Sequence, residues 1–166
     1  MTIKSTAPSV APTECFRAVM DESEQGSITA GSYHDVLFDL LPVNTKGGTP
    51  LNTSTGIFTV PSGMAGIWDI QAQIRLFALD PGRQYTFTIE EKDADPFNGV
   101  IAILDADAEQ HSITAAWRVE LSAGDEIVAT LRPAGSGYDD TKIDGNAAYS
   151  WMDFTFHPRA GWLGLI

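Results

Sequence analysis

A stretch of nine residues that alternates strictly between apolar and polar side chains most constrains the fold. From Trp68 to Leu76 every second residue is apolar, and the residues between them are Asp, Gln or Arg. Successive side chains of a β-strand point to opposite faces, so this period of two predicts a strand with one buried face. The β-branched and aromatic segment Gly56–Pro61 precedes it and predicts a second strand, which ends at Pro61 because proline cannot donate to a ladder.

The rest of the chain repeats this pattern of short strands and turn residues. No stretch of ten or more residues has the apolar stripe of a helix. We therefore predict an all-β fold, an antiparallel β-sandwich of the jelly-roll type in a single domain. The further strands are predicted over Cys15–Met20, Val36–Leu41, Tyr85–Glu90, Val100–Asp105, Ile113–Leu121, Ile127–Arg132 and Ala148–His157.

The buried faces of these strands predict the core. Its expected members are the apolar residues that alternate along them: Phe58, Trp68, Ile70, Ile74, Phe87, Trp117, Val119, Leu121, Phe154 and Phe156.

Three motifs follow one another in a fixed order along the chain. They are Phe38 and Asn44 followed by Gly56–Pro61, Gly63 and Gly66–Trp68; Leu121–Ile127; and the aromatic last strand, Tyr149–Phe156. Together they resemble the complement component 1q and tumour necrosis factor superfamily. Trp68 stands where that family usually has tyrosine or phenylalanine, and the loop 62–66 is about one residue longer than the usual form. The resemblance covers roughly residues 14–157 and implies a jelly roll that trimerises, but it does not imply one function.

The two chain ends differ in composition from the domain at 14–157. Residues 1–13 are rich in Ser, Thr, Pro and Ala and predict an extended arm, either a frayed terminus or a segment that docks on a partner. Residues 158–166 form an apolar tail containing Trp162 and Leu163. The tail either seals its own sandwich or packs against another protein.

Charge and composition exclude several classes of protein. The formal net charge of −12 argues against a nucleic-acid partner, because phosphate binding depends on Lys and Arg. The apolar runs are far shorter than the ~20 residues of a membrane span, and no basic segment followed by an apolar core indicates a signal peptide. We expect a soluble protein, or a virion-surface protein if a phage encodes it. Cys15, the single cysteine, allows no intrachain disulfide.

No catalytic motif is present, so we expect no enzyme activity. The sequence lacks a nucleophile elbow, a P-loop and an H-E-x-x-H motif, and its three histidines lie in separate segments. No cofactor is expected. The loop Tyr138–Asn146 offers oxygen ligands but lacks the spacing and final glutamate of a calcium loop. Some complement-type proteins hold calcium near their three-fold axis, so the resemblance leaves a calcium ion open here.

Two aromatic residues of the last strand are the candidate trimer interface. Met152, Phe154 and Phe156 suit the core, which places Tyr149 and Trp151 on the opposite face. A solvated face should be polar, and large apolar residues there usually mark an interface. We therefore expect the last strand to face a three-fold axis. In the competing interpretation the C-terminal tail of the same chain covers Trp151.

Two functional hypotheses follow. The first is a non-enzymatic, trimeric virion structural protein, such as a head or tail fibre, a spike or a decoration subunit, with other virion or surface-assembly proteins as partners at the chain ends. The alternative is a trimeric module that binds a glycan or a receptor, in which exposed aromatic rings beside Asp and Asn would contact the ligand.

Overall fold

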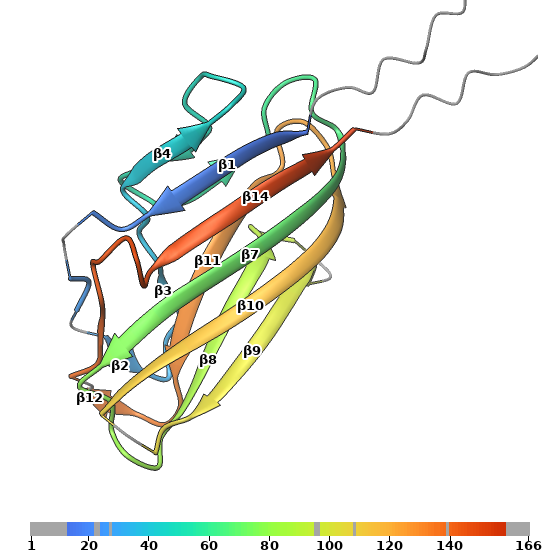
Figure 1. Ribbon diagram of the computed structural model, residues 1–166. Helices are drawn as coiled ribbons and strands as arrows, with labels where there is room; N and C mark the ends of the chain where they lie inside the picture. The colour runs from blue at the N-terminus through green and yellow to red at the C-terminus, as the bar shows by residue number, and fades with distance from the viewer. Residues whose placement is uncertain are drawn as a thin grey trace, which may run out of the picture.

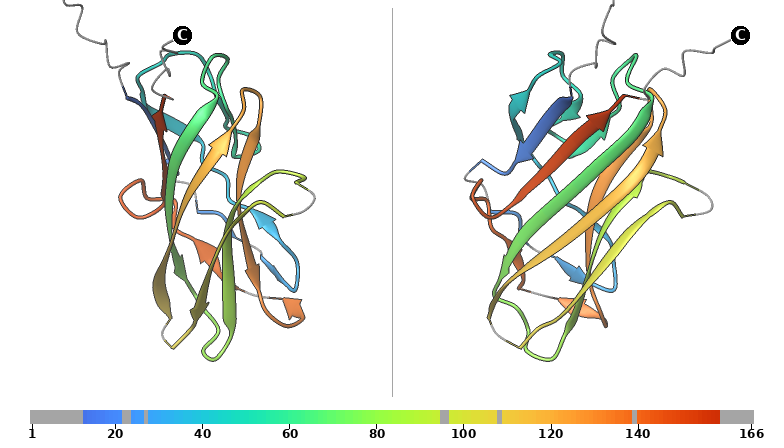
Figure 2. Two further views of the ribbon diagram at one scale, coloured as in Figure 1. Left: turned by 90° about the vertical axis from the view of Figure 1, so that its right-hand side faces the viewer. Right: turned by 45° about the vertical axis from the view of Figure 1, so that its right-hand side comes forward.

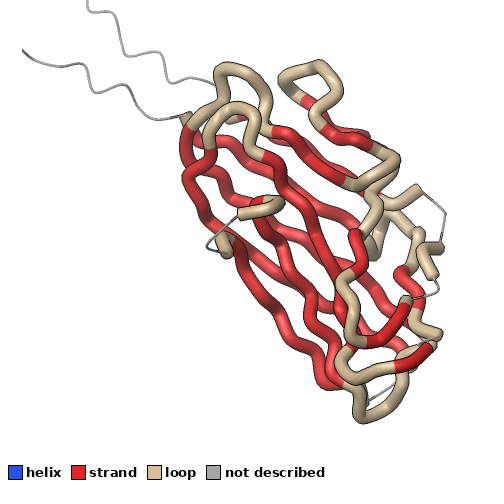
Figure 3. Tube along the Cα trace, turned by 180° about the vertical axis from the view of Figure 1, so that it is seen from behind, coloured by secondary structure: helices blue, strands red, loops and turns tan. Residues whose placement is uncertain are grey.

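Only β-strands, turns and loops occur in the described part of the chain. The computed structural model describes residues 13–21, 24–26, 28–94, 97–107, 109–138 and 140–158 (Figure 3). No helix of those residues is long and apolar enough to cross a membrane. The strands are β1 (Glu14–Val19), β2 (Thr29–Ala30), β3 (His34–Asp35), β4 (Leu40–Asn44), β5 (Leu51–Asn52), β6 (Ile57–Thr59), β7 (Gly66–Phe77), β8 (Gln84–Glu91), β9 (Gly99–Asp105), β10 (Gln110–Leu121), β11 (Glu126–Pro133), β12 (Gly137–Tyr138), β13 (Lys142–Ile143) and β14 (Trp151–His157).

Two antiparallel sheets pack face to face (Figures 1 and 2). The first, which we call the β14 sheet, has the order β10-β7-β14-β1-β4. The short strand β13 pairs with the C-terminal end of β7. The second, the β11 sheet, has the order β5-β6-β11-β8-β9, and β3 pairs with β11. A separate pair joins β12 to β2. The predicted all-β sandwich is therefore confirmed.

Aromatic side chains fill the space between the sheets. The Phe58 ring from the β11 sheet stacks on Phe154 from the β14 sheet, with centroids 3.8 Å apart and planes 16° apart. Phe16 and Trp68 each contact Phe58 edge-on, at 5.3 and 5.9 Å. The indole Nε1 of Trp68 donates to the carbonyl of Met64 at 3.1 Å, so burial leaves no unpaired donor there.

Eight of the ten predicted core residues are buried. The exceptions are Trp117 and Val119, which are half-buried and pack against the core from one side. Both lie on β10, the edge strand of its sheet, opposite Ile70 and Trp68 of β7. An edge strand has a neighbour on one side only, so its inward side chains are less completely covered.

A glycine is required where the chain enters β6. Gly56 has a φ of +70°, in the left-handed region that favours glycine. A Cβ there would lie 2.3 Å from the carbonyl oxygen of Val36. Any other residue at position 56 would therefore clash with this oxygen unless the backbone moved. The path of the backbone into β6 therefore requires glycine at this position.

The predicted strand at Val36–Leu41 is wrong. Residues 36–39 lie outside any strand, and β4 instead runs from Leu40 to Asn44 with Pro42 inside it. Proline is tolerated because β4 is the edge strand of the β14 sheet, so a missing N–H need not leave a ladder bond unmade. The buried Val36 and Phe38 still contribute to the core from irregular backbone.

The first and last strands of the domain are neighbours. β1 pairs with β14 in antiparallel register, with Glu14 opposite Phe156. The start of the first strand and the end of the last one therefore lie at the same end of the sandwich (Figure 1). The predicted arm, apart from residue 13, and the predicted tail, apart from residue 158, fall outside the described residues.

Replacing Phe58 with alanine should destabilise the fold by about 3–5 kcal/mol, because it removes a fully buried ring that contacts three others. Phe97→Ala is the matched control, because the Phe97 side chain is 51% exposed and its loss should cost less than about 1 kcal/mol. Urea unfolding at one fixed protein concentration measures both variants. Equal losses for the two would show that the core is not centred on Phe58.

Candidate assembly surface

The outer face of the β14 sheet is defined by the alternation of its central strand. Met152, Phe154 and Phe156 of β14 point into the core and are buried. The intervening side chains therefore lie on the outer face, in the middle of a sheet with β7 on one side and β1 on the other. Trp151 is the large apolar member of this outward-facing set.

Trp151 continues into an apolar stripe on the neighbouring strands. Val19 of β1 lies opposite Trp151, and Leu40 of β4 lies opposite Val19 in turn. Leu40 and Val43 are 42% and 40% exposed. We call Val19, Leu40, Val43 and Trp151 the outer stripe; Val19 within it is only 3% exposed, so the other three residues supply its accessible apolar surface. It crosses three adjacent strands, which is an unusual arrangement for a solvated sheet face.

Each predicted interface aromatic contacts an arginine. The Arg17 guanidinium lies 5.0 Å from the centroid of the Trp151 ring, and that of Arg75 lies 3.5 Å from the centroid of Tyr149. Both distances are within the range of a cation–π contact. Trp151 is half-buried and Tyr149 is 39% exposed, so both rings keep surface that a partner can cover.

Tyr149 reaches this face from a turn rather than from the strand. The predicted last strand at Ala148–His157 starts too early, because β14 begins at Trp151. Asn146 organises the preceding turn: its carbonyl accepts from the backbone N–H of Tyr149 and Ser150, and its Oδ1 accepts from that of Ala148. These bonds replace the ladder bonds that an extended strand would make.

A carboxylate lies beside Trp151 in the half-buried part of the surface. Asp153 Oδ2 is 3.6 Å from the Arg17 guanidinium. Burial raises the pKa of Asp153 above its ordinary value, and the charge on Arg17 opposes that rise. Desolvation therefore outweighs the ion pair, and ionised Asp153 disfavours the folded chain.

Two further polar clusters lie on the same sheet. The His157 Nε2 is 2.7 Å from Asp69 Oδ2, and Arg118 is 3.6 Å from the other oxygen of Asp69. Arg75 forms an ion pair with Asp144, one of the carboxylates of the loop considered for calcium. Across the part of the chain that the structure describes, no three His, Cys, Asp or Glu side chains are placed to hold a metal ion.

The sequence prediction named Trp151 and Tyr149 as the interface and did not include the other residues of the outer stripe. The predicted first strand already places Arg17 and Val19 on the face opposite Phe16 and Ala18, so the alternation contained that signal. Leu40 carried no such signal, because its strand was predicted with the wrong bounds.

Replacing Asp153 with asparagine should raise stability at neutral pH relative to the wild type. The carboxyl has a raised pKa in the folded state, so its contribution is most favourable below the unfolded pKa of about 3.8 and is lost as the pH rises through the folded value. The advantage of D153N should therefore grow between pH 4 and pH 7. Urea midpoints across that range test this; an advantage that shrinks with pH would mean that the Arg17 pair dominates.

Comparison with known proteins shows similarity of structure without detectable similarity of sequence. No protein-family model and no curated protein matches the chain. Eiger TNF from S. frugiperda superimposes with a TM-score of 0.63 at 14% identity, over 93% of this chain and 99% of that one. The globular domain of zebrafish complement 1qA gives a TM-score of 0.55 at 12% identity, over 86% of this chain and 95% of the domain.

A phage virion protein has the same fold. The PRD1 vertex protein P5 superimposes with a TM-score of 0.57 at 13% identity, over 87% of this chain and 97% of that one. These likenesses confirm, at the level of the fold, the resemblance that the three sequence motifs indicated. The chain folds as a jelly roll of the tumour necrosis factor and C1q type.

Proposed function

We propose that this chain is a non-enzymatic structural subunit of a virion that trimerises through the outer face of its β14 sheet. The observation that carries the proposal is the outer stripe, together with Tyr149, on the central strands of a sheet face that solvent alone would leave polar. The fold supports it, because one protein with this jelly roll is a virion vertex protein.

In a three-fold arrangement each residue of this surface contributes to the interface three times. Side chains close to the axis of a closed ring meet their own copies, so one Trp151 in the sequence supplies three rings to the assembly. Each large ring that becomes buried contributes on the order of 1.5–3 kcal/mol. The Arg17 side chain, already over Trp151, would then lie at the edge of the buried rings.

The shared position of the chain ends suggests where the trimer attaches. Because β1 starts beside the end of β14, three copies around one axis bring all their ends to the same end of the assembly. We assign this end as the attachment base and the loops at the opposite end as outward-facing. Ordering the arm on a partner costs roughly 1–2 kcal/mol per residue, which the contacts at the base must offset.

A binding module is the second candidate, and a separate observation favours it. The outer face of the β11 sheet carries a depression of about 700 Å³, within the size range of ligand sites. A trimer that is anchored at the base and binds a receptor or glycan on the host would combine both functions.

Trp151→Arg should dissociate the trimer while leaving the monomer folded. The added charge has no partner at the axis, and three copies would repel one another there. Sedimentation velocity reports the assembly, and near-ultraviolet circular dichroism reports the packing of the core. Tyr33→Arg is the control, since Tyr33 is 59% exposed and lies against the β11 sheet. A monomeric wild type, or a trimeric W151R, would refute the proposed interface.

Deleting residues 1–13 should separate assembly from attachment. The truncated chain should still trimerise, because the outer stripe lies entirely within residues 19–151. It should no longer enter particles when it competes with the full-length chain in an incorporation assay. Undiminished incorporation would show that the arm is not the dock, whereas loss of trimerisation would show that the arm belongs to the assembly surface.

A further inference from the structure

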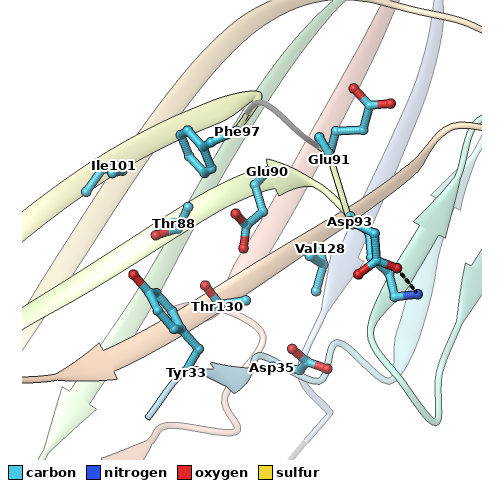
Figure 4. A pocket seen from close by; sticks show the side chains of 12 residues that line it. Tyr33, Asp35, Thr88, Glu90, Glu91, Asp93, Phe97, Ile101, Val128 and Thr130 are labelled. Carbon is cyan, nitrogen blue, oxygen red and sulfur yellow. Dashed lines mark ion pairs between the residues drawn. The ribbon is translucent and has the colours of Figure 1, made fainter. Parts of the chain in front are cut away.

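The outer face of the β11 sheet has a depression that the proposed trimer contact does not use. Its floor is formed by β8 and β11, and its sides by β3, β9 and the turn after β8 (Figure 4). Its volume is about 700 Å³. The proposed interface lies on the opposite layer of the sandwich, so the depression stays accessible in that trimer.

Strand register brings two carboxylates into this depression. Glu90 of β8 lies opposite Val128 of β11, and Asp35 of β3 lies opposite Thr130 on the other side of the same strand. Figure 4 shows the Glu90 carboxylate directed into the hollow between β8 and β11. On β9 the residue opposite Glu90 is Gly99, where a Cβ would lie 2.8 Å from the Glu90 Cα, so no side chain fills that position.

These two carboxylates have no cationic partner in the described part of the chain. The lysine of the depression, Lys92, lies 3.2 Å from Asp93 and 3.4 Å from Glu126, and these carboxylates satisfy its charge. Glu91 accepts a hydrogen bond from Asn98 at 2.8 Å. Within the described residues neither Asp35 nor Glu90 forms an ion pair; the guanidinium of Arg132, two residues after Thr130 on β11, lies instead over the Tyr33 ring at 5.2 Å from its centroid.

The charge on Glu90 is unfavourable in the empty depression. Burial raises the pKa of Glu90, the nearby charge of Asp35 raises it further, and only the Thr130 hydroxyl lowers it. The attraction of a bound cation would offset both unfavourable contributions, because it favours the ionised carboxylate.

A buried hydroxyl beside Glu90 is a further polar group of the depression. Thr130 is 4% exposed and lines the depression, where its side chain lies beside Glu90. Its Oγ1 is buried and lies close enough to Glu90 to lower the pKa of that carboxyl, but it makes no hydrogen bond of normal distance and angle. Buried hydroxyls are normally hydrogen-bonded, so this one can still accept a hydrogen bond from a donor in the hollow.

The rim of the depression is apolar. Tyr33, Phe97 and Ile101 line it and are 59%, 51% and 54% exposed. Ile103, on the same face of β9 two residues beyond Ile101, is 60% exposed. These four are among only seven large hydrophobic side chains exposed in the described residues, so exposed apolar surface is concentrated beside the acidic floor.

We propose that this depression binds the guanidinium group of an arginine side chain that a protein partner presents. Asp35, Glu90 and the Thr130 hydroxyl would accept its hydrogen bonds, while Ile101, Phe97 and Tyr33 would cover its aliphatic stem. The depression would then select the protein partner, and it lies on the face of the subunit that the proposed trimer leaves exposed.

The arrangement favours guanidinium over other cations. The five N–H donors of a guanidinium group spread in a plane and match acceptors that come from three different strands. An ammonium group is instead a compact point charge. Guanidinium also stacks on aromatic faces: Arg132 already lies over the Tyr33 ring at this rim, and the exposed Phe97 ring stands beside it. A metal ion needs several converging ligands, and no such group of three occurs among the described residues.

The test titrates an arginine tripeptide into the full-length protein. The perdeuterated, ¹⁵N-labelled chain is observed by NMR while N-acetyl-Gly-Arg-Gly-amide is added; the lysine and citrulline tripeptides serve as matched probes. Saturable shifts should appear at the amides of Thr88, Glu90 and Thr130, with a Kd on the order of 1–10 mM for so small a probe. Citrulline, which keeps the shape and lacks the charge, should not bind.

Three variants separate the site from a general attraction to acidic surface. Glu90→Gln should weaken binding at least about tenfold, because it removes a charge-assisted bond. Thr130→Val should also weaken binding, because it removes a hydroxyl that would accept a hydrogen bond from the guanidinium. Asp105→Asn makes the same change of charge on β9 outside the depression, and should leave the Kd unchanged.

Several results would overturn the proposal. Equal affinity for the lysine tripeptide would rule out a preference for guanidinium. Unchanged affinity of E90Q for the arginine tripeptide would rule out the proposed site. Loss of self-association by E90Q in sedimentation velocity would mean that a second copy of this chain supplies the cation, which contradicts an outside partner. A monomeric wild type that still shows the predicted shifts would refute the proposed trimer alone.

Discussion

Packing of aromatic rings between two sheets is the interaction on which the rest of this structure depends. The stack of Phe58 on Phe154 joins the β11 sheet to the β14 sheet, and Phe16 and Trp68 surround it from the neighbouring strands. Rings of this size bury a large apolar area and contact one another in preferred geometries, so they fix both the spacing and the register of the layers. The positions of both outer faces follow from that packing.

The two outer faces are chemically different although the same alternation generates both. On the β14 sheet, Leu40 and Val43 are exposed, and Trp151 is half-buried beside the Arg17 guanidinium. On the β11 sheet, Glu90 and Asp35 place two carboxylates beside the buried hydroxyl of Thr130. One face therefore suits contact between copies, and the other suits a cationic ligand. Similar folds serve unrelated functions because such features lie on outward-facing positions, which the core does not constrain.

The order of strands connects the proposed assembly with the proposed attachment. β14 occupies the centre of its sheet, and β1 is its immediate neighbour. The strand that would face a three-fold axis is thus the one whose end lies beside the start of the domain. In the proposed trimer, contacts at the axis and at the base would come from adjacent strands, so the geometry of one would limit the geometry of the other.

The sequence alone determined the fold class and most of the core, because period-two alternation is local and survives in β7, β8, β10 and β14. It also placed Trp151 on the outer face, since the core requires Phe154 and Phe156 on the other. It failed at Pro42 and at Tyr149, where edge position and a turn formed by Asn146 override local preference. Only the tertiary structure could bring Asp35 to Glu90 and place Thr130 beside them. These residues are far apart in sequence, and their meeting depends on which strands pair and in which register.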